Sequence, residues 1–255
     1  MDTDPIVSTN PSIVAAIESS SRADRRRRWR NALTLAAVVV LTVVAAVCWT
    51  FRGPWFSGNL AVLDSGRLVR SAQPTAELGR WIEQYGIRSI LNLRGGGPAD
   101  WWYQGEVEQA ETHDVAFYDL PLNATRRPRR RELLILIDLL ERCRYPLLVH
   151  CKSGADRTGL ASALYLLVRK GASPQEAEGA FSLEFGHVPL FGPEHLHEPL
   201  REYAAWLKTK GLAHQPALFR EWVKTEYAAP DPAVDPPILP AGPRATRRQP
   251  TPAAG

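Results

Sequence analysis

The longest uninterrupted apolar stretch of the chain is the run of twenty residues from Ala32 to Phe51, which contains no charged side chain. At ~1.5 Å of rise per helical residue, such a run matches the ~30 Å hydrocarbon core of a bilayer. A helix in the core of a globular domain would show a polar stripe at helical spacing, but only three threonines interrupt this run. The pattern therefore predicts a single membrane-spanning helix over residues 32–51.

A cleaved export signal is the main alternative to a membrane span. The run is longer than the apolar region of a signal peptide, and its end lacks the small residues that precede a cleavage site. Residues 44–48 are also a poor match to a lipoprotein cleavage site. The paired arginines before the run leave a twin-arginine export route open. We expect the helix to remain as a membrane anchor.

The arginines around this run predict its orientation. Six arginines lie within residues 22–30, whereas Arg52 is the only cation in the fifteen residues after the run. Cytoplasmic flanks of membrane helices carry an excess of Lys and Arg, so residues 1–31 are expected to be a basic cytoplasmic segment. The rest of the chain is then expected outside the cytoplasm, held at the cell membrane by a single pass.

Short apolar runs and helical patterns alternate between residues 58 and 227. Strands are expected at residues 60–62, 68–70, 89–93, 115–120 and 146–150. Helices are expected at residues 75–85, 101–113, 128–143, 156–170, 174–183, 194–210 and 216–225, with Thr75 and Ser173 at N-cap positions. The alternation predicts one α/β domain, in which four to five strands form a central, mostly parallel sheet with helices on both faces.

The end of the chain and the overall composition give less information about fold and function. Residues 228–255 hold eight prolines and few large apolar side chains, which predicts a disordered tail. Abundant arginine, alanine and proline with little lysine is typical of a bacterium with a GC-rich genome. The basic residues cluster beside the apolar run without interleaved aromatics, which disfavours nucleic acid as a partner.

The most informative chemistry follows the predicted strand at residues 146–150. Cys151 comes directly after this strand, at the carboxyl end, where open α/β sheets bind their ligands. Residues 152–157 must then turn the chain into a helix, and Gly154 allows backbone conformations that other residues resist. The N–H groups of such a turn and the positive end of the helix dipole form a cradle for a tetrahedral anion and favour a cysteine thiolate. The sequence predicts a nucleophilic thiolate in a phosphate site.

Residues around Cys151 suit this chemistry. The planar guanidinium of Arg157 can hold two phosphate oxygens and remains charged as the transition state develops. Thr158 is expected to donate a hydrogen bond to the sulfur, and His150 is expected to orient the loop rather than act as a base. The residues expected to bind the phosphate group of the substrate are Lys152, Ser153, Gly154, Ala155, Thr158 and Arg94. An exposed loop position beside three glycines is the alternative for Arg94.

The pattern of His150, Cys151, Gly154, Arg157, Thr158 and Gly159 resembles the active-site loop of cysteine-dependent dual-specificity and tyrosine phosphatases. Residues 69–74, 86–94 and 185–187 resemble the bacterial dual-specificity-like group, so the similarity covers nearly the whole domain. The resemblance implies a protein-tyrosine-phosphatase-like fold and hydrolysis of a phosphomonoester through a phosphocysteine intermediate, without metal or cofactor. By the same resemblance Cys151 is the nucleophile and Arg157 the phosphate binder.

The resemblance also implies an aspartic acid that protonates the leaving oxygen and then activates water. Asp119 lies 32 residues before Cys151, a separation typical of the family, but many relatives carry the acid after a Pro-Leu step that here is followed by residues 123–125. Asp156 is the rival, because some phosphoinositide-directed relatives carry an aspartate just before the arginine. Asp100 and Glu184 stay open as further sources.

Other residues are interpreted more simply. Five arginines within residues 126–131 are either a solvated helix start or a rim that attracts anionic substrate or lipid head groups. Lys152 would favour a substrate with several negative charges. Trp101, Trp102 and His187 are expected to pack. A strand separates Cys143 from Cys151 by more than the ~7 Å that a disulfide spans, so no bridge is expected.

Three functions fit these residues. The first is a membrane-anchored phosphatase acting on a phosphorylated protein or a phosphoinositide. The second is a module of the same fold that binds phosphate or anionic lipid with little catalysis. The third is a sulfurtransferase, which the length of the cysteine loop disfavours. The sequence does not determine the substrate or the oligomeric state.

Overall fold

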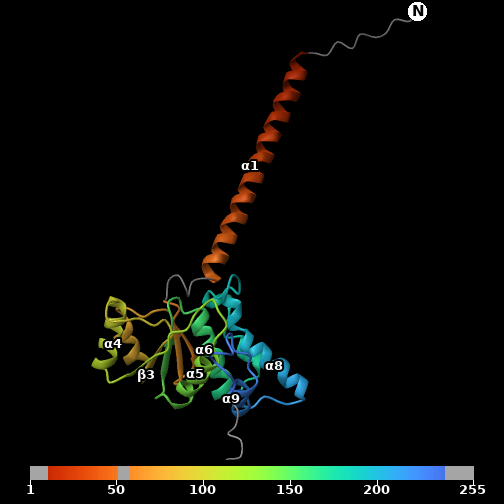
Figure 1. Cartoon of the computed structure of the whole chain (residues 1–255). Helices are drawn as coiled ribbons and strands as arrows, with labels where there is room; N and C mark the ends of the chain where they lie inside the picture. Colours follow the sequence, from red (N-terminus) through yellow and green to blue (C-terminus); the bar gives the residue numbers. More distant parts are fainter. Residues whose placement is uncertain (1–10, 51–57, 239–255) are drawn as a thin grey trace, which may run out of the picture. The chain divides into compact units, whose positions relative to one another are not determined.

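The computed structural model of the 255-residue chain describes residues 11–50 and 58–238, with side chains for residues 25–49 and 58–238 (Figure 1). The chain divides into two compact units, Met1–Thr50 and Phe51–Gly255. The two units are described separately below.

The first unit contains a single described helix, α1 (Pro11–Thr50), in which the predicted basic segment and span are continuous. Among the described residues, only the segment Arg25–Trp49 of this helix is long and apolar enough to cross a membrane, judged by length and composition. This segment is not buried. Thr34 and Thr42 donate their hydroxyl hydrogens to the carbonyls of Arg30 and Val38 at 2.9 and 2.8 Å. Both polar groups are thus satisfied within the helix, as an apolar surrounding requires. Phe51 lies outside the described residues.

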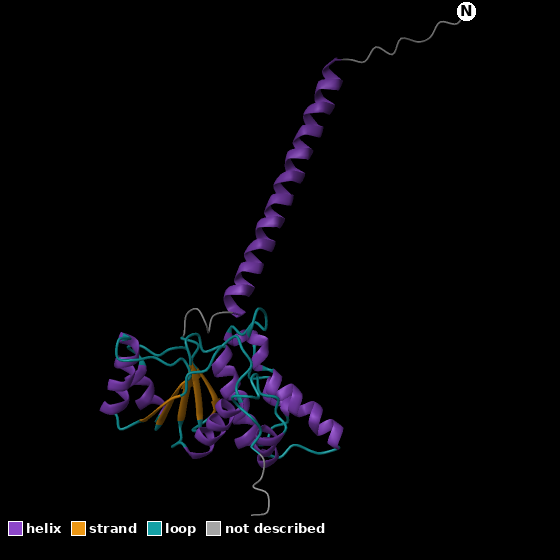
Figure 2. Cartoon of the chain, in the orientation of Figure 1, coloured by secondary structure: helices purple, strands orange, loops and turns teal. Residues whose placement is uncertain are grey.

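The second unit is built on a five-stranded sheet with the order β1-β2-β5-β3-β4 (Figure 2). The strands are β1 (Ala61–Asp64), β2 (Leu68–Ser71), β3 (Ser89–Asn92), β4 (Ala116–Asp119) and β5 (Leu147–His150). Only β1 pairs antiparallel, with β2, and all other neighbours are parallel. The predicted α/β fold with a mostly parallel sheet is confirmed, and the central position of β5 places Cys151 at the middle of the carboxyl edge.

Helices cover both faces of this sheet, as predicted (Figure 1). On one face α3 (Leu78–Tyr85) and α4 (Trp101–Thr112) pack against Ile90 and Leu148. On the other face α5 (Arg130–Arg142) and α6 (Asp156–Lys170) pack against Leu91 and Val149, with α7 (Pro174–Glu178), α8 (Glu198–Lys210) and α9 (Pro216–Thr225) around them. Alternate residues of these strands enter opposite cores, which explains why Ile90 and Leu91 of β3 and Leu148 and Val149 of β5 are apolar on both faces.

Several element boundaries differ from prediction for local reasons. Thr75 does not cap a helix, because α3 begins only at Leu78; the Thr75 hydroxyl donates to the Glu77 side chain in the turn before it. Ser173 does cap α7 in a capping box, as predicted, but α7 stops at Glu178 before Gly179. The short 3₁₀ helix η1 (Leu183–Phe185) lies at the end of the predicted helix 174–183. The 3₁₀ helix η2 (Pro193–Leu196) replaces the beginning of the predicted helix 194–210.

The segment after α9 packs on the domain up to the last described residue. Arg130 is buried and donates to the carbonyls of Val223, at 3.0 Å, and of Tyr227 and Asp235. The Ile238 N–H donates to the Lys224 carbonyl at 2.9 Å. Residues 228–238 of the predicted tail therefore contact the domain, and residues 239–255 lie outside the described residues.

Candidate active site

A tight loop at the carboxyl end of β5 forms the floor of the candidate site. Cys151 follows the strand directly and is 1% exposed, and α6 begins at Asp156. Gly154 has φ +70°, and a Cβ built on it would lie 2.6 Å from backbone atoms of Ser71 and Ala72 on the neighbouring chain segment. Only glycine combines this left-handed conformation with so close an approach. We call residues 151–157 the phosphate loop.

Donors from outside the loop hold three successive carbonyls on its outer side. The Gln73 N–H donates to Lys152 O at 3.2 Å. The Asn59 amide donates to Ser153 O at 2.9 Å, and the Arg70 guanidinium donates to Gly154 O at 2.8 Å. Because the C=O and N–H of a trans peptide unit point in opposite directions, the following three N–H groups point to the inner side of the loop.

These inner N–H groups belong to Ser153, Gly154 and Ala155, and within residues 58–238 they donate no hydrogen bond. Together with the start of α6 they form a concave group of free donors. Such a backbone nest at a helix N-terminus is an anion-binding arrangement. The loop therefore has the donors that a phosphate group needs.

Arg70 supports this loop from β2 and is itself 0% exposed. Besides Gly154 it donates to the Ala180 carbonyl at 2.9 Å, and its guanidinium carbon lies 3.7 Å from the centre of the Phe185 ring. Burial lowers the pKa of Arg70 to about 10, while the negative charges of Cys151 and Glu184 act in the opposite direction. A buried cation thus sits behind the loop and holds the Gly154 carbonyl in place.

Arg157 connects the phosphate loop to two neighbouring strand ends. Its Nη1 donates to the carbonyls of Leu93 and Leu122, both at 3.3 Å. Its Nε is buried and has no hydrogen-bond partner in the described part of the chain, and the same holds for the Thr158 hydroxyl. Both groups are available donors beside the nest, as expected for residues that bind a phosphate group or stabilise a leaving thiolate.

His150 and Arg94 belong to one polar network next to the loop. The Nε2 atom of the buried His150 lies against the buried Glu106 carboxylate of α4. Glu106 also accepts a hydrogen bond from the Gln73 side chain at 3.0 Å, and Gln73 accepts one from Arg94 at 3.3 Å. The Arg94 guanidinium stacks over Trp102 at 3.5 Å. His150 is therefore held by a carboxylate, and Arg94 is positioned beside Gln73 rather than free in a surface loop.

Asp119 ends β4 at the same edge of the sheet as Cys151. Asn92 pairs with both Asp119 and His150, so Asp119 and His150 lie two strands apart, ~10 Å at ~4.8 Å per strand. The Tyr103 hydroxyl donates to its Oδ2 at 3.4 Å. Partial burial of the carboxyl and the charge of Glu106 raise the pKa of Asp119, although the residue as a whole reaches solvent and the hydrogen bond from Tyr103 opposes the shift. An exposed carboxyl with a raised pKa suits a proton donor.

Asp156, the rival carboxyl, is engaged elsewhere. It lies in the first turn of α6, and its Oδ1 is 2.8 Å from His187 Nδ1. Asp100 accepts a hydrogen bond from the Gly97 N–H at 3.0 Å at the start of α4. Among the candidates for the general acid, Asp119 has the environment that best fits a residue that releases and regains a proton.

The arginine cluster at residues 126–131 is mainly structural. Arg126 pairs with Glu132, Arg127 pairs with Glu198 and Glu202, and Arg130 is the buried residue described above. Arg129 and Arg131 are exposed. The predicted cationic rim is reduced to these two side chains.

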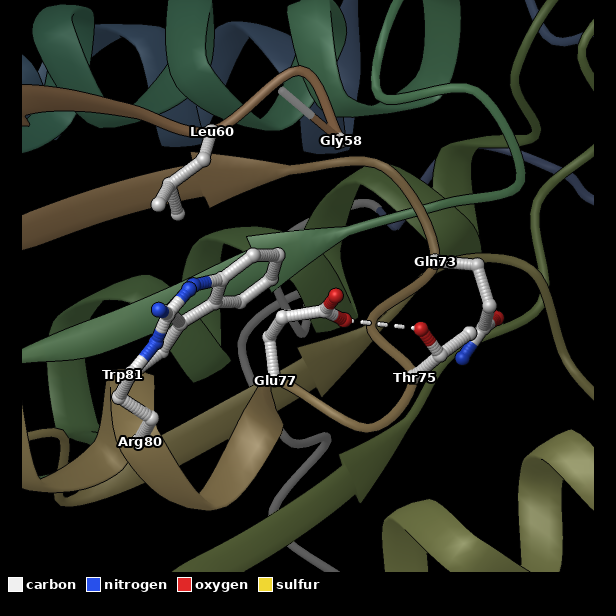
Figure 3. Close-up of a pocket in the computed structure, with 7 residues that line it drawn as sticks. All are labelled: Gly58, Leu60, Gln73, Thr75, Glu77, Arg80 and Trp81. Atoms are coloured by element: carbon white, nitrogen blue, oxygen red, sulfur yellow. Dashed lines mark hydrogen bonds between the residues drawn. The ribbon is translucent and has the colours of Figure 1, made fainter. Parts of the chain in front are cut away.

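A cavity of about 390 Å³ adjoins the phosphate loop through Gln73. Figure 3 shows the Trp81 ring and the hydrogen-bonded Thr75 and Glu77 side chains beside it. Its lining residues are Gly58, Leu60, Gln73, Thr75, Glu77, Arg80 and Trp81. The cavity is lined by a mixture of apolar and charged groups and lies on the side of the outer loop carbonyls.

The residues that support the loop were not identified from the sequence. Asn59, Arg70, Gln73 and Glu106 are distant in the chain from Cys151 and carry no motif of their own apart from the stretch 69–74. His187 packs against Phe181, as expected, and in addition contacts Asp156. No group of three or more His, Cys, Asp or Glu side chains that could hold a metal occurs in the residues that the structure describes.

Comparisons with known proteins identify the family of the chain. The model of the family described as "DSP-PTPase phosphatase fused to NAD+ Kinase" matches residues 56–190, more than half of the chain. The dual specificity protein phosphatase TpbA of Pseudomonas aeruginosa is 30% identical over 114 residues, which are 44% of this chain and 49% of TpbA. The chain thus spans about half the length of the curated relatives it matches.

Solved structures of similar proteins include P. aeruginosa TpbA, at 26% identity and a TM-score of 0.45, covering 58% of this chain and 92% of TpbA. PTPMT1 in complex with PI(5)P matches at 18% identity and a TM-score of 0.42, covering 60% of this chain and 98% of PTPMT1. With its matching family model and its cysteine loop at the carboxyl edge of a parallel sheet, the chain belongs to the DSP-PTPase family of cysteine-dependent dual-specificity and tyrosine phosphatases.

Proposed function

We propose that this protein is a membrane-anchored phosphatase that hydrolyses phosphomonoesters of a phosphorylated protein or a phosphoinositide through a phosphocysteine intermediate. The observation that carries the proposal is the phosphate loop itself. Three outward carbonyls are tied to Gln73, Asn59 and Arg70, and three N–H donors remain free beside the buried Cys151.

In the first step the Cys151 thiolate attacks phosphorus, and the bond from phosphorus to the leaving oxygen breaks. The free N–H groups of the loop and the Arg157 guanidinium bind the non-bridging oxygens as their negative charge grows. Asp119, in its protonated form, gives its proton to the leaving oxygen. The products of this step are an alcohol, a phosphocysteine and the Asp119 carboxylate.

In the second step water attacks phosphorus and the bond to sulfur breaks. The Asp119 carboxylate takes one proton from the water, which restores the acid for the next cycle. The Thr158 hydroxyl, buried and without a partner among the described residues, donates to the departing sulfur. Inorganic phosphate leaves and the Cys151 thiolate is regenerated, so protons and electron pairs balance over the two steps.

The anchor is proposed from helix α1. Residues 32–49 of this helix are apolar and unburied, and with their internally satisfied threonines they fit a bilayer better than water. With the arginine excess before this part, we place the N-terminus in the cytoplasm and the catalytic domain, residues 58–227 and the packed segment up to Ile238, outside it. Residues 239–255 are proposed as a tail from composition alone.

The decisive experiment uses the full chain in detergent micelles and an aryl phosphate as substrate. Cys151→Ser is expected to abolish turnover, because serine is a far weaker nucleophile in a site built for a thiolate. Cys143→Ser, at a second buried cysteine outside the loop, serves as the matched control and should keep the activity. Rapid acid quench of the wild-type protein should trap a phosphorylated Cys151.

Two results would contradict the proposal. Equal turnover in the wild-type protein and in Cys151→Ser would exclude the phosphocysteine. Protection of the wild-type fold by inorganic phosphate without any turnover would instead support a module that binds phosphate. A panel of phosphotyrosine peptide, phosphoserine peptide and phosphoinositide then ranks the substrates.

A further inference from the structure

A hydrogen-bonded chain of side chains runs from the phosphate loop through the domain. His187 Nδ1 lies 2.8 Å from Asp156 Oδ1, and His187 Nε2 lies 2.8 Å from His197 Nε2. His197 Nδ1 lies 2.6 Å from Glu178 Oε1, which also accepts a hydrogen bond from Arg201 at 2.6 Å. The two imidazole rings are 3% and 5% exposed.

The packing around the two rings is tight and depends on a glycine of the sequence motif. The Phe181 ring stacks on His197 with centres 4.1 Å apart and lies 4.9 Å from His187. A Cβ on Gly159 would come within 2.7 Å of Phe181 Cδ1, so only glycine at this position of α6 leaves room for that ring. The pair is therefore shielded from solvent by a residue that Gly159 admits.

A count of hydrogens fixes the protonation of the chain. Three contacts, from Asp156 to His187, from His187 to His197 and from His197 to Glu178, each need one hydrogen. Two neutral imidazoles supply only two N–H groups. With both carboxylates ionised, the pair must hold one additional proton, and a second additional proton would place two hydrogens between the facing Nε2 atoms.

The charges that face the pair fit one shared proton. Asp156 faces it from α6, Glu178 from α7 and Arg201 from α8, and Phe181 adds no charge. With the shared proton, two negative carboxylates meet the cationic pair and the arginine, and the sum is zero. Charge neutrality is what a buried cluster requires.

We propose that His187 and His197 are positioning residues of the phosphate loop: by sharing one proton they hold Asp156 ionised and fixed at the start of α6, and a second proton releases it. The inference rests on the proposed function and adds to it a pair of residues, and a pH dependence, that act through Asp156. Neither histidine touches the phosphate group.

The pH dependence follows from the geometry. When both rings are doubly protonated, the Nε2 to Nε2 contact at 2.8 Å becomes repulsive and the chain must open. Burial and the charge of the neighbouring His187 lower the pKa of His197, so the second proton binds only at acidic pH. Opening the chain frees Asp156, which directly precedes Arg157, and loosens the loop.

The test compares pH profiles of kcat/KM for an aryl phosphate with the full chain in micelles. We expect kcat/KM of the wild-type protein to fall at low pH with a slope steeper by about one proton than that of His197→Gln. Glutamine keeps a donor at the Nε2 position but does not titrate. His214→Gln is the matched control, since His214 bonds to Tyr203 and the Leu167 carbonyl, away from the loop. It should keep the wild-type slope.

A second readout needs no turnover. In Cys151→Ser labelled with ¹⁵N-histidine, the two rings should titrate as one coupled pair, and His197→Gln should abolish that coupling. Equal acid slopes in the wild-type protein and His197→Gln, or independent titration of His187 and His197, would overturn the inference. If the wild-type protein shows no turnover, the proposed function fails, and the histidine titration alone decides whether the proton is shared.

Discussion

The phosphate loop and the acid loop, residues 119–129, meet at the carboxyl edge of the sheet but are built differently. In the phosphate loop Cys151, Gly154 and Ala155 are buried, and the carbonyls from residues 152 to 154 each have a donor from another segment. The acid loop is anchored through the N–H groups of Leu120 and Leu122, and Asp119 at its start is exposed. One loop is fixed before substrate arrives, whereas the other carries a side chain that solvent can reach.

This difference corresponds to the two tasks. Binding a developing charge requires donors that do not reorganise during the reaction. Proton transfer requires a carboxyl that exchanges protons with water in each cycle, and solvent access serves that exchange. The following four predictions test this difference by changing one of these features at a time.

The largest effect is expected from Arg157→Lys. Lysine keeps the charge but loses the planar fork, so it cannot both bind phosphate oxygens and donate to the carbonyls of Leu93 and Leu122. We expect kcat/KM to fall by about 10³ or more, with the fold preserved. Arg169→Lys on the outer end of α6 is the control and should remain within about twofold of the wild-type protein, as surface changes usually do.

Asp119→Asn should have the next largest effect, a loss of about 10² to 10³ in kcat that is greatest for poor leaving groups. Because the pKa of Asp119 is raised, its protonated form persists to higher pH than that of an ordinary aspartic acid. The activity of the wild-type protein should therefore decline as pH rises through this pKa, and the decline should be absent in Asp119→Asn.

Asp156→Asn is the comparison for this prediction. It should lose less activity than Asp119→Asn with good leaving groups and should retain the decline at high pH. If Asp156→Asn instead removes that decline, the proton donor is Asp156 and the assignment of roles to the two carboxyls is wrong.

Gly154→Ala tests how rigid the phosphate loop is. The substitution forces alanine into φ +70° with its Cβ against the backbone of Ser71, and we expect a loss of about 2 to 4 kcal/mol in the free energy of unfolding. Gly211→Ala has nearly the same φ, +65°, but meets nothing within 4 Å, so it isolates the conformational cost of about 1 kcal/mol. Denaturant unfolding of both variants measures the difference, and equal losses would show that the loop has room to relax.

The smallest effect is expected from Tyr103→Phe, which removes the hydroxyl that donates to Asp119. Since this hydrogen bond lowers the pKa of Asp119, its loss should move the decline at high pH to higher values while kcat changes by less than about tenfold. Tyr118→Phe, on the same strand β4 as Asp119, is the control. If the decline of activity moved to lower pH in Tyr103→Phe, the hydrogen bond from Tyr103 would not lower the pKa of Asp119.

The sequence predicts the phosphate loop well because its determinants are local. An apolar strand, Cys151, Gly154 and the start of α6 lie within ten residues, and α6 begins and ends as predicted. The sheet and its two helical layers also follow from local periodicity. Thr75 misled the prediction of α3 because the residues after it form a turn, closed by the hydrogen bond from the Leu78 N–H to the Thr75 carbonyl, and the helix begins only at Leu78.

What supports the loop could not be predicted from local patterns. Arg70, Asn59 and Glu106 each reach the site from a distant segment, and nothing in their immediate sequence shows which carbonyl or ring they contact. Asp119 lies 32 residues before Cys151 and Asp156 five residues after it, yet both positions are compatible with a general acid by family resemblance, and only their surroundings distinguish them. The facing pair of His187 and His197 depends on how η2 and the segment before it fold onto α6, which periodicity does not reveal.

The burial of Cys151 has a consequence for oxidative damage. The other two cysteines are Cys48 in the first unit and Cys143 at the far end of β5, and all three are unpaired. A strand of four residues at ~3.3 Å each separates Cys143 from Cys151, beyond the ~7 Å that a disulfide allows. A sulfenic acid formed on Cys151 would thus find no resolving cysteine within its own domain. Its reduction back to the thiolate would depend on a free thiol small enough to reach the sulfur before further oxidation.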